Sequence, residues 1–460
     1  MNLNDKISKY IINNSNRIKI NSKDIKKNDI FIALKGTKYH GNKFINDAFI
    51  AGAKYCITDK KYNYKYKKEN ILYIDSVLSF LKISSIKKRS LYSGEVVGIT
   101  GSAGKTSLKE YLKYFLEKKY KVSASIKSYN NELGVMISIL NMNIKSDFAI
   151  FEIGTNNFFE IRDLTKLVKP SQIFITNILS THLKNFKNKK NIAKEKSDIF
   201  NKKYNSNAKI LYFQMNSDDE IIINNFAKKH KIKNIIKTGH SKLDCYIKNI
   251  KAHKSKYKIN LKNLDKYFSF VLKKYEETEV KNLIFVLAFF VKNNIDTKTI
   301  IKNKSKYPQI DGRGSVHKIV MNGININLID QSYNANPDTM IESIKNFAKI
   351  KKNGFDKILI LGEMNELGLD EVYFHYKVIK QTNEHIFDKM ILSGDLFKKA
   401  LNMFPNFKSK YIYRSSSKSI MSYLNKNVHK KAILMAKCSN ATQVNKFVKL
   451  LKLKKKDKIV

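Results

Sequence analysis

The stretch Gly98-Ile-Thr-Gly-Ser-Ala-Gly-Lys105-Thr106-Ser107 decides how the rest of this sequence is interpreted. It follows an apolar, β-branched segment at Glu95–Thr100, and it opens a segment, Lys105–Lys118, in which apolar residues recur at helical spacing. A glycine-rich turn between a strand and a helix presents backbone N–H groups and the positive end of the helix dipole, and both attract phosphate. The sequence therefore predicts a nucleotide-binding loop within an α/β domain.

Two side chains of this loop carry the expected chemistry. Lys105 is long enough to reach the β- and γ-phosphates, and Thr106 offers a hydroxyl to Mg²⁺. The strict pattern for such loops has glycine five residues before Gly104, where this chain has Ile99, so a plain strand-to-helix turn is the alternative. The flanking segments favour the nucleotide. We expect ATP to contact the whole loop: Gly101, Ser102, Ala103, Gly104, Lys105, Thr106 and Ser107.

Segments beyond the loop alternate between apolar strands and helical stretches, a pattern typical of parallel sheets covered by helices. The predicted strands are Phe148–Ile153, Gln172–Asn177 and Lys209–Phe213, then Ile326–Ile329, Lys357–Leu361, Lys389–Ser393 and Ala432–Ala436. We therefore predict three α/β domains. A small mixed α/β domain spans residues 1–92, a central P-loop domain with a parallel sheet spans 93–307, and a Rossmann-like domain spans 308–460.

The charge balance restricts the class of partner. The 460 residues carry a formal net charge of +49, which invites a nucleic-acid interpretation, yet only five of the 88 Lys+Arg residues are arginines. The guanidinium of arginine is the preferred group for binding phosphates and bases. Because arginine is scarce in this chain, we expect no nucleic-acid partner. A basic P-loop NTPase that binds RNA stays the alternative from another class.

Cysteine usage and hydropathy indicate the compartment. Cys56, Cys245 and Cys438 stand far apart and form no CxxC pair, which fits a reducing environment. Residues 1–9 lack the apolar core of a signal peptide, and the longest apolar run, Leu283–Val291, is less than half of a membrane span. We expect a cytoplasmic monomer without membrane insertion.

Several separated segments resemble one known family. These are the phosphate loop, Phe31-Ile-Ala-Leu-Lys-Gly36 with His40-Gly41, Asp330-Gln-Ser-Tyr-Asn-Ala-Asn-Pro337, and Leu361-Gly-Glu-Met-Asn-Glu-Leu-Gly368. In order and in register, they resemble the Mur ligases, the ATP-dependent enzymes that build the peptidoglycan stem peptide. The likeness runs from about Asn21 to about Val448. Within the family, it is strongest to the member that adds the final dipeptide.

The resemblance assigns a metal site and a modified lysine. Glu152 ends an apolar strand and matches a family ligand of Mg²⁺, while His182 matches the family's histidine ligand of a second Mg²⁺. Lys196 matches the lysine that CO₂ carbamylates, which would make it a further metal ligand. From the residues alone, helical spacing places Lys196 on an apolar stripe, where a stem that snorkels to water is the usual outcome. The implied catalytic set is Lys105, Glu152, His182 and Lys196.

Other positions are assigned to substrates by the same resemblance. ATP is expected to meet Arg313, Asp330, Asn334 and Asn336 from the C-terminal domain. The peptide substrates are expected to meet Ser22, Lys35, Gly36, Asn130, Asn131, Lys437 and Ser439. From the residues alone, turns rich in Asn are nearly as good an explanation for the asparagines.

The implied reaction is the ATP-dependent, ADP-forming synthesis of an amide through an acyl phosphate. The implied substrates are UDP-N-acetylmuramoyl-tripeptide and D-alanyl-D-alanine, and the implied cofactors are ATP and Mg²⁺. A rival within the family adds the third stem residue to UDP-muramoyl-dipeptide. That enzyme carries an Asp-Asn-Pro-Arg segment, which this sequence lacks.

Overall fold

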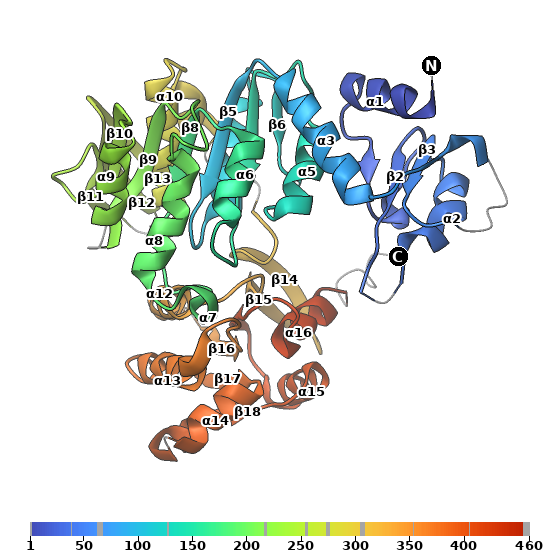
Figure 1. Ribbon diagram of the computed structural model, residues 1–460. Helices are drawn as coiled ribbons and strands as arrows, with labels where there is room; N and C mark the ends of the chain where they lie inside the picture. The colour runs from blue at the N-terminus through green and yellow to red at the C-terminus, as the bar shows by residue number, and fades with distance from the viewer. Residues whose placement is uncertain are drawn as a thin grey trace. The chain divides into compact units, whose positions relative to one another are not determined.

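The chain divides into two compact units (Figure 1). The computed structural model describes residues 2–37, 39–61, 68–126, 128–215, 219–253, 256–272, 277–303, 309–352, 354–403 and 405–453. The first unit comprises residues 1–177 and 193–303, and the second comprises 178–192 and 304–460. The predicted boundary between residues 92 and 93 falls inside the first unit, and the one between 307 and 308 lies outside the described residues. The domain boundaries therefore stay predictions.

A small parallel sheet forms the N-terminal part of the first unit. Its strands lie in the order β1-β2-β3-β4, with bounds Ile18–Lys19, Ile30–Ala33, Tyr55–Thr58 and Ile71–Tyr73. The helices of this part are α1 (Leu3–Asn13), α2 (Ile45–Ile50) and α3 (Val77–Ser90). Buried Phe31, Phe49 and Cys56 form part of one apolar core cluster between sheet and helix.

A nine-stranded sheet forms the rest of the first unit, in the order β13-β12-β11-β10-β9-β8-β5-β7-β6 (Figure 1). Strands β5 to β9 have the bounds Glu95–Thr100, Val122–Ala124, Phe148–Glu152, Gln172–Ile175 and Ile210–Met215. Strands β10 to β13 have the bounds Asn234–Gly239, Cys245–His253, Lys256–Asn263 and Lys266–Leu272. The pairings from β6 to β11 are parallel, whereas β11, β12 and β13 pair antiparallel.

Helices accompany this sheet, as expected for parallel strands that are buried on both faces. Their bounds are α4 Lys105–Leu116, α5 Glu132–Asn141, α6 Glu160–Val168, α9 Asp219–Lys229, α10 Glu277–Lys292 and α11 Lys298–Asn303. Helix α8, Lys189–Ser197, begins in the second unit and belongs to the first from residue 193 onward. Packing of α10 on the sheet is aromatic: Phe174 stacks on Tyr212 at 4.4 Å between ring centroids, and Phe285 meets Phe174 edge-on at 5.6 Å.

The second unit contains a six-stranded sheet in the order β14-β15-β19-β16-β17-β18. The strand bounds are Ser315–Met321, Ile324–Gln331, Asp356–Gly362, Lys389–Ser393, Ile412–Tyr413 and Ala432–Lys437 for β14 to β19. Only β14 and β15 pair antiparallel. The helices are α7 Leu183–Phe186, α12 Pro337–Ala348, α13 Glu371–Thr382, α14 Asp395–Met403, α15 Ser417–Asn427 and α16 Gln443–Leu453.

The α/β architecture predicted from the sequence is confirmed. The strands predicted at Glu95–Thr100 and Lys389–Ser393 have these bounds in the structure, and the other predicted strands agree to within a few residues. The helix predicted to end at Lys118 ends at Leu116. The antiparallel extension β11–β13 was not predicted, because β12 and β13 alternate between buried and more exposed residues and contain no continuous apolar run.

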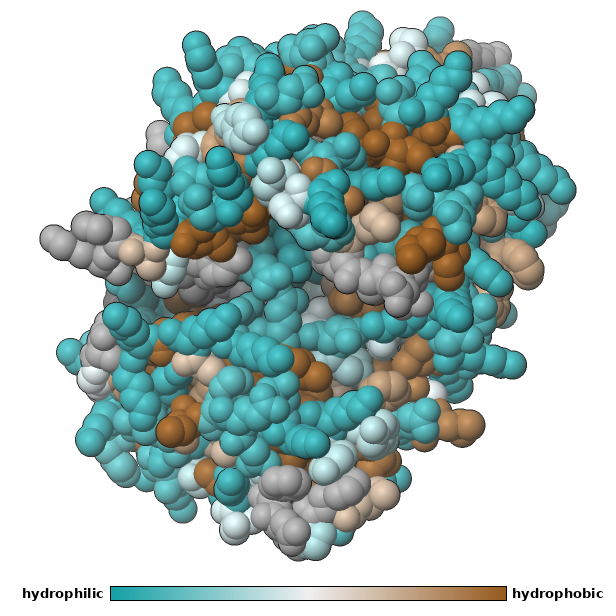
Figure 2. All heavy atoms as spheres, turned by 90° about the vertical axis from the view of Figure 1, so that its left-hand side faces the viewer, coloured by the Kyte–Doolittle hydropathy of each residue, from teal (hydrophilic) through white to brown (hydrophobic). Residues whose placement is uncertain are grey.

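Hydrophilic residues dominate the face drawn in Figure 2, with apolar side chains scattered between them. This agrees with a chain in which 28% of residues are charged. Within the described part of the chain, every helix is too short or too polar to span a membrane.

One buried lysine joins the helices around the small sheet to the large one. Lys88 of α3 is 0% exposed, and its ammonium donates to the carbonyls of Ile11 (2.7 Å), Asn14 (3.0 Å) and Leu140 (2.7 Å). Ile11 and Asn14 belong to α1 and its C-cap, whereas Leu140 lies in α5 beside the large sheet. A single amino group thus donates to three carbonyls from two parts of the unit, while burial lowers the pKa of Lys88 to about 7.

Replacing Lys88 by Met should destabilise the first unit by roughly 2–4 kcal/mol, because the carbonyls lose their shared donor. Urea unfolding followed by far-UV circular dichroism measures the loss. Lys87→Met is the matched control, since the neighbouring Lys87 is exposed. Equal losses in the two variants would contradict the role given to Lys88.

Candidate active site

The predicted phosphate loop connects β5 to α4 at an interior strand of the large sheet, between β7 and β8. Gly101 has φ +142° and Gly104, the N-cap of α4, has φ +83°, conformations that favour glycine. A Cβ on Gly101 would lie 1.9 Å from the hydroxyl of Thr176, so only glycine fits there. Ile99, where the strict pattern has glycine, is a strand residue that is 0% exposed.

Polar residues just beyond β8 shape the loop. The backbone carbonyl of Asn177 accepts the Ser102 N–H at 3.0 Å, and the Asn177 side chain accepts the Ala103 N–H at 2.8 Å. The Thr176 hydroxyl donates to the Ala103 carbonyl at 2.5 Å, while Lys105 donates to a loop carbonyl at 2.8 Å. Thr176 and Asn177 were not among the residues predicted to act in the site. A Thr-Asn pair directly after a buried strand is the signal that could have identified them.

Glu152 stands at the end of β7, beside the loop. Its carboxylate is 1% exposed and accepts hydrogen bonds from the Thr106 hydroxyl at 2.7 Å and from the Asn130 side-chain amide at 2.8 Å. The parallel register aligns Ile99 of β5 with Glu152, and this alignment places the carboxylate where the loop begins. The hydroxyl of Ser128 lies 3.1 Å from that of Thr106. The structure thus brings together Thr106, Glu152 and Asn130, which are far apart in the sequence.

This donor set fits Mg²⁺. The hydroxyl of Thr106 and the carboxylate of Glu152 are hard oxygen donors, and Mg²⁺ uses one or two protein oxygens beside phosphate oxygens and water. The amide of Asn130 holds one carboxylate oxygen in place, so the other oxygen and the hydroxyl face each other. Thr106 and Glu152 are therefore the residues that would hold the ion.

Lys196 differs from every other buried lysine in the described part of the chain. The buried lysines are Lys88, Lys109, Lys196, Lys357 and Lys437. Four of them donate to backbone carbonyls at 2.7–3.4 Å. No hydrogen bond or ion pair joins the ammonium of Lys196 to any described residue, although its side chain is buried at 2% exposure. A snorkelling stem, the alternative that the residues left open, does not fit this burial.

The surroundings of Lys196 disfavour its charged form. Burial, and to a smaller extent the positive charge of Lys105, lower the pKa of Lys196 to about 7, with Glu195 acting in the opposite direction. Glu195 does not pair with Lys196, because its carboxylate accepts the backbone N–H groups of Phe159 at 2.8 Å and Ile161 at 2.9 Å. Lys196 is thus an amine that loses its proton more readily than an ordinary lysine. It lies close enough to Lys105 of the phosphate loop for their charges to interact.

In the second unit, backbone hydrogen bonds join the loop that contains Arg313 to the loop at residues 330–333. Its neighbours Gly312 (φ +74°) and Gly314 (φ +95°) have left-handed backbones, and its guanidinium lies 4.3 Å from the ring centroid of Tyr333. The Gly314 N–H donates to the Asp330 carbonyl at 2.7 Å, and the Tyr333 N–H donates to the Gly312 carbonyl at 3.2 Å. The structure therefore brings Arg313 and Asp330, both predicted to meet ATP, into one pair of crosslinked loops.

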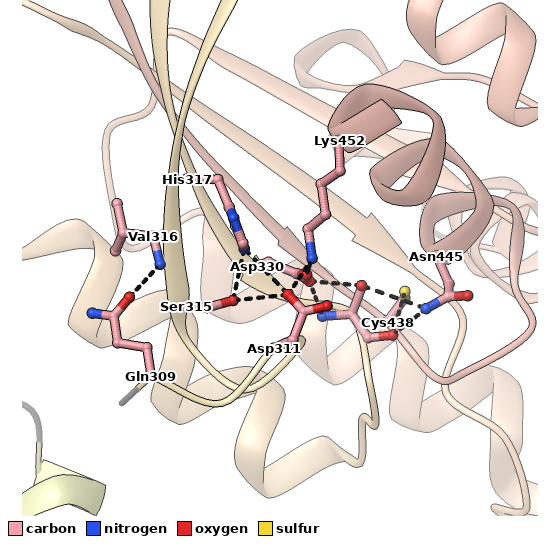
Figure 3. A network of polar contacts seen from close by, with 10 residues as sticks. Gln309, Asp311, Ser315, Val316, His317, Asp330, Cys438, Asn445 and Lys452 are labelled. Atoms are coloured by element: carbon pink, nitrogen blue, oxygen red, sulfur yellow. Dashed lines mark hydrogen bonds and ion pairs between the residues drawn. The ribbon is translucent and has the colours of Figure 1, made fainter. Parts of the chain in front are cut away.

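The carboxylate of Asp330 is occupied by donors from its own chain (Figure 3). It is 1% exposed, accepts the N–H (2.9 Å) and the hydroxyl (2.7 Å) of Ser332, and forms an ion pair with Lys452 of α16. Lys452 also pairs with Asp311 at 2.5 Å, and His317 lies 3.3 Å from Asp311. Ligand atoms of Asp311, His317 and Asp330 converge within 4.8 Å, but the ammonium of Lys452 already supplies a cation to both carboxylates. A contact of Asp330 with ATP stays a prediction.

The remaining predicted residues of this unit mainly hold its loops. Asn336 caps α12 in a reciprocal capping box with Thr339. The carbonyl of Asn334 lies 3.4 Å from the ammonium of Lys437, and the hydroxyl of Ser439 accepts the N–H of Asn365 at 3.0 Å. Their predicted contacts with ATP and substrate stay predictions.

Predicted substrate residues of the first unit lie in turns and caps. Ser22 begins a 3₁₀ helix, and Lys35 forms an isolated β-bridge with His40. The Gly36 N–H donates to the Tyr39 carbonyl at 2.9 Å. Asn131 caps α5 by accepting the N–H of Gly134 at 2.9 Å. These contacts are compatible with structural roles, so the predicted substrate contacts stay predictions.

His182, the predicted second metal ligand, belongs to the second unit, whereas Thr106 and Glu152 belong to the first. Its Nδ1 contacts the carboxylate of Glu366, and the contact with His182 lowers the pKa of Glu366 below its ordinary value. Two residues earlier, the Ser180 N–H donates to Asp338 at 2.9 Å. The role of His182 as a metal ligand stays a prediction.

A glycine-rich loop at an interior parallel strand, with a hydroxyl and a carboxylate beside it, defines a P-loop nucleotide-binding protein. Two family models match the chain: "Mur ligase middle domain" at residues 99–290 and "Mur ligase family, catalytic domain" at residues 15–124. The chain belongs to the Mur ligase family. Members of this family are ATP-dependent, ADP-forming ligases, so the protein is an enzyme of that class.

Relatives and solved structures align along nearly the whole chain. The chain is 29% identical over 440 residues to the UDP-N-acetylmuramoyl-tripeptide–D-alanyl-D-alanine ligase of Rickettsia prowazekii, covering 95% of each protein. It is 28% identical to the ligase of the same name from Buchnera aphidicola subsp. Acyrthosiphon pisum, covering 96% of this chain and 94% of the relative. Its fold is similar to that of MurF from Acinetobacter baumannii (TM-score 0.77, 22% identity, 95% and 93% covered). It is also similar to MurF from Thermotoga maritima in complex with ADP (TM-score 0.76, 22% identity, 97% and 99% covered). The three-domain Mur ligase fold is therefore confirmed.

Replacing Lys452 by Met should lower the free energy of unfolding of the second unit by roughly 2–4 kcal/mol, because Asp330 keeps a buried charge without its partner. The KM for ATP should rise as well, since the crosslinked loops carry Arg313. Urea unfolding and initial-rate kinetics measure the two effects. Lys449→Met changes an exposed lysine of the same helix and should leave both values near wild type. A Lys452→Met enzyme with wild-type stability would contradict the stabilising role given to the ion pairs of Lys452.

Proposed function

We propose that this enzyme joins D-alanyl-D-alanine to UDP-N-acetylmuramoyl-tripeptide in the cytoplasmic synthesis of peptidoglycan precursors. Relatives of that name align with 95% or more of the chain. The single observation that carries the proposal is the convergence of Thr106, Glu152 and Asn130 beside a glycine loop. This arrangement suits the transfer of a phosphoryl group from ATP to a carboxylate.

The reaction needs ATP because a carboxylate and an amine do not condense at neutral pH, where hydroxide is a poor leaving group. Transfer of the γ-phosphoryl group to the terminal carboxylate of the tripeptide gives an acyl phosphate and ADP. The amino group of D-alanyl-D-alanine then attacks the acyl carbon. A tetrahedral intermediate collapses to the amide, phosphate leaves, and the amine gives up a proton.

The residues of the first unit bind and neutralise the transferring group. N–H groups of the glycine loop and the N-terminus of α4 bind phosphate oxygens, and Lys105 brings an ammonium to the β- and γ-phosphates. Thr106 and Glu152 would hold Mg²⁺, which supplies positive charge to the triphosphate when bound. Asn130 orients the carboxylate of Glu152 through its amide.

Residues of the second unit are proposed to contact ATP as well. Arg313 would bring a guanidinium to the triphosphate, with Asp330, Asn334 and Asn336 as further contacts to ATP. The UDP-sugar would meet Ser22, Lys35 and Gly36. Asn131, Lys437 and Ser439 would contact the peptide substrates. Exclusion of water would protect the acyl phosphate from hydrolysis.

Lys196 would act as a carbamate. A neutral lysine amine attacks CO₂, a new N–C bond forms, and a proton leaves, so a cation becomes an anion. Burial without a hydrogen-bonding partner among the described residues, and a pKa lowered to about 7 mainly by burial, both favour the neutral amine that this reaction needs. The product would add a carboxylate-like metal ligand near Lys105.

Two alternatives make different predictions. A ligase that adds the third stem residue would turn over with a single amino acid in place of D-alanyl-D-alanine. A basic NTPase that binds RNA would hydrolyse ATP when polynucleotide is added and would lose affinity steeply with salt. We favour the dipeptide ligase, acting as a monomer without a nucleic-acid partner.

Phosphate release should require ATP, UDP-N-acetylmuramoyl-tripeptide and D-alanyl-D-alanine together. A coupled phosphate assay with each component omitted in turn measures this requirement, and mass spectrometry identifies the pentapeptide product. Single amino acids and polynucleotide are the comparison additions. Turnover stimulated by polynucleotide alone would refute the proposal.

Lys196→Ala should abolish most ligase activity, and acetate or another short carboxylate should restore part of it by replacing the carbamate. Native mass spectrometry of the wild type in bicarbonate should find a species heavier by the mass of one CO₂, which is absent from the variant. Lys194→Ala, an exposed lysine of the same helix, is the control. Full activity of Lys196→Ala without added carboxylate would rule out the carbamate.

A further inference from the structure

The helix that follows the phosphate loop carries a buried lysine with no part in the mechanism given above. Lys109 lies three residues after Thr106 in α4, so the two side chains project from the same face of the helix. Lys109 is 0% exposed, and Thr106 is 4% exposed. The Lys109 ammonium donates to the backbone carbonyl of Ser125 at 2.7 Å and lies 3.0 Å from the carboxylate of Glu110. A carbonyl and a carboxylate thus compensate this buried charge, all within the first unit.

The serine that accepts this hydrogen bond lies just after the edge strand of the large sheet. Strand β6 ends at Ala124, and β7 is its neighbour in the sheet. The Ser125 N–H donates to the Ile150 carbonyl at 2.9 Å, and the Ser125 hydroxyl accepts the N–H of Glu152 at 3.1 Å. Ser125 is buried, so these contacts are shielded from water. One serine therefore connects Lys109 of α4 to the backbone of Glu152.

The contacts of Lys109 and Ser125 close a ring around Glu152. From the first turn of α4, the Thr106 hydroxyl donates to the Glu152 carboxylate at 2.7 Å. The Glu152 N–H donates to the Ser125 hydroxyl, and the Ser125 carbonyl accepts from Lys109. Lys109 stands about one helical turn from Thr106, which completes the ring. The backbone and the carboxylate of Glu152 are therefore both fixed relative to one helix.

Stability alone is a weak reason for a lysine at residue 109. The attraction within a buried ion pair often does no more than offset the cost of desolvation, and apolar residues of similar volume can replace such pairs without loss. Methionine would fill the space of the lysine stem, but it has no donor for the Ser125 carbonyl. The ammonium adds a directed hydrogen bond to the segment that holds Glu152.

We propose that Lys109 and Ser125 are positioning residues for the metal-binding pair Thr106 and Glu152. Lys109 holds the backbone of Ser125, and Ser125 holds the backbone of Glu152. These contacts do not use the oxygens that would bind Mg²⁺, so they persist when those oxygens become ligands. Groups that orient metal ligands from behind tune the affinity for the ion. The inference rests on the assignment of Thr106 and Glu152 to Mg²⁺ in the proposed function.

Metal affinity of the full chain is the first readout, measured by electron paramagnetic resonance with Mn²⁺ and a non-hydrolysable ATP analogue. Ser125→Ala and Lys109→Met should each weaken the Mn²⁺ site roughly 10-fold, because the backbone of Glu152 loses its support. Ser125→Thr keeps the hydroxyl and should retain most of the affinity. The affinity of Ser125→Ala for the analogue in EDTA should stay at the wild-type value, because Lys105 and the glycine loop are intact. Unchanged Mn²⁺ affinity in both Ser125→Ala and Lys109→Met would overturn the proposal.

Two matched variants separate positioning from a general loss of stability. Ser123→Ala removes a hydroxyl of β6 that also accepts a backbone N–H, but from Asn143 at 2.9 Å. Lys88→Met removes another buried lysine of the first unit that donates to backbone carbonyls. Both should unfold at a lower temperature than the wild type while their Mn²⁺ affinity stays unchanged. Equal weakening of Mn²⁺ binding in these controls would contradict a specific role for the ring.

The Mg²⁺ dependence of phosphate release is the second readout. Ser125→Ala should need roughly 10-fold more Mg²⁺ for half-maximal rate, with the KM for D-alanyl-D-alanine unchanged. A raised KM for the dipeptide with an unchanged Mg²⁺ requirement would argue against the inference. If Lys109→Met fails to fold, the comparison of Ser125→Ala with Ser125→Thr decides the question by itself.

These readouts separate the inference from the proposed function. If the wild type binds Mn²⁺ with nucleotide but fails to ligate D-alanyl-D-alanine, the proposed function falls, and the Mn²⁺ series still decides the roles of Lys109 and Ser125. If the wild type ligates and both variants bind Mn²⁺ normally, only the inference falls. If Glu152→Gln binds Mn²⁺ as tightly as the wild type, the metal assignment and the inference fall together.

Discussion

The hydrogen bond from Thr106 to the buried carboxylate of Glu152 is the contact on which the rest of the site depends. A carboxylate with 1% exposure is tolerated only where donors surround it, and here they come from the first turn of α4 and from Asn130. Because β5 and β7 are parallel neighbours, their carboxyl ends meet at one edge of the sheet. The sheet therefore places the glycine-rich loop and the carboxylate that we propose as a Mg²⁺ ligand side by side.

The roles of the buried lysines differ, and the hydrogen-bonding partners of each lysine indicate its role. Lys88, Lys109, Lys357 and Lys437 are buried, and each donates to backbone carbonyls, which is a structural use of the ammonium. Lys196 is buried to a similar degree without such a donor bond among the described residues. That contrast supports the proposal that Lys196 has a chemical rather than a structural role.

In the second unit, loops are organised by contacts between residues far apart in sequence. Lys452 forms ion pairs with both Asp311 and Asp330 (Figure 3). The guanidinium of Arg313 lies over the ring of Tyr333. The hydroxyl of Ser439 accepts the N–H of Asn365, the residue before Glu366. Two of these loops carry Arg313 and Asp330, which are proposed to contact ATP, and the third carries Glu366, which contacts His182. The loops of this unit thus form a crosslinked frame rather than independent turns.

The sequence by itself determined the α/β class, the order of most strands, the phosphate loop and the family, because local periodicity and a contiguous motif encode them. It also placed Lys196 on an apolar stripe. Only the tertiary structure decided that Asp330 turns its carboxylate to Lys452, that Asn177 shapes the phosphate loop, and that Glu366 meets His182. Those contacts join residues 74 to 184 positions apart, so no local pattern could reveal them. They follow from how sheets and loops pack, which depends on the whole chain at once.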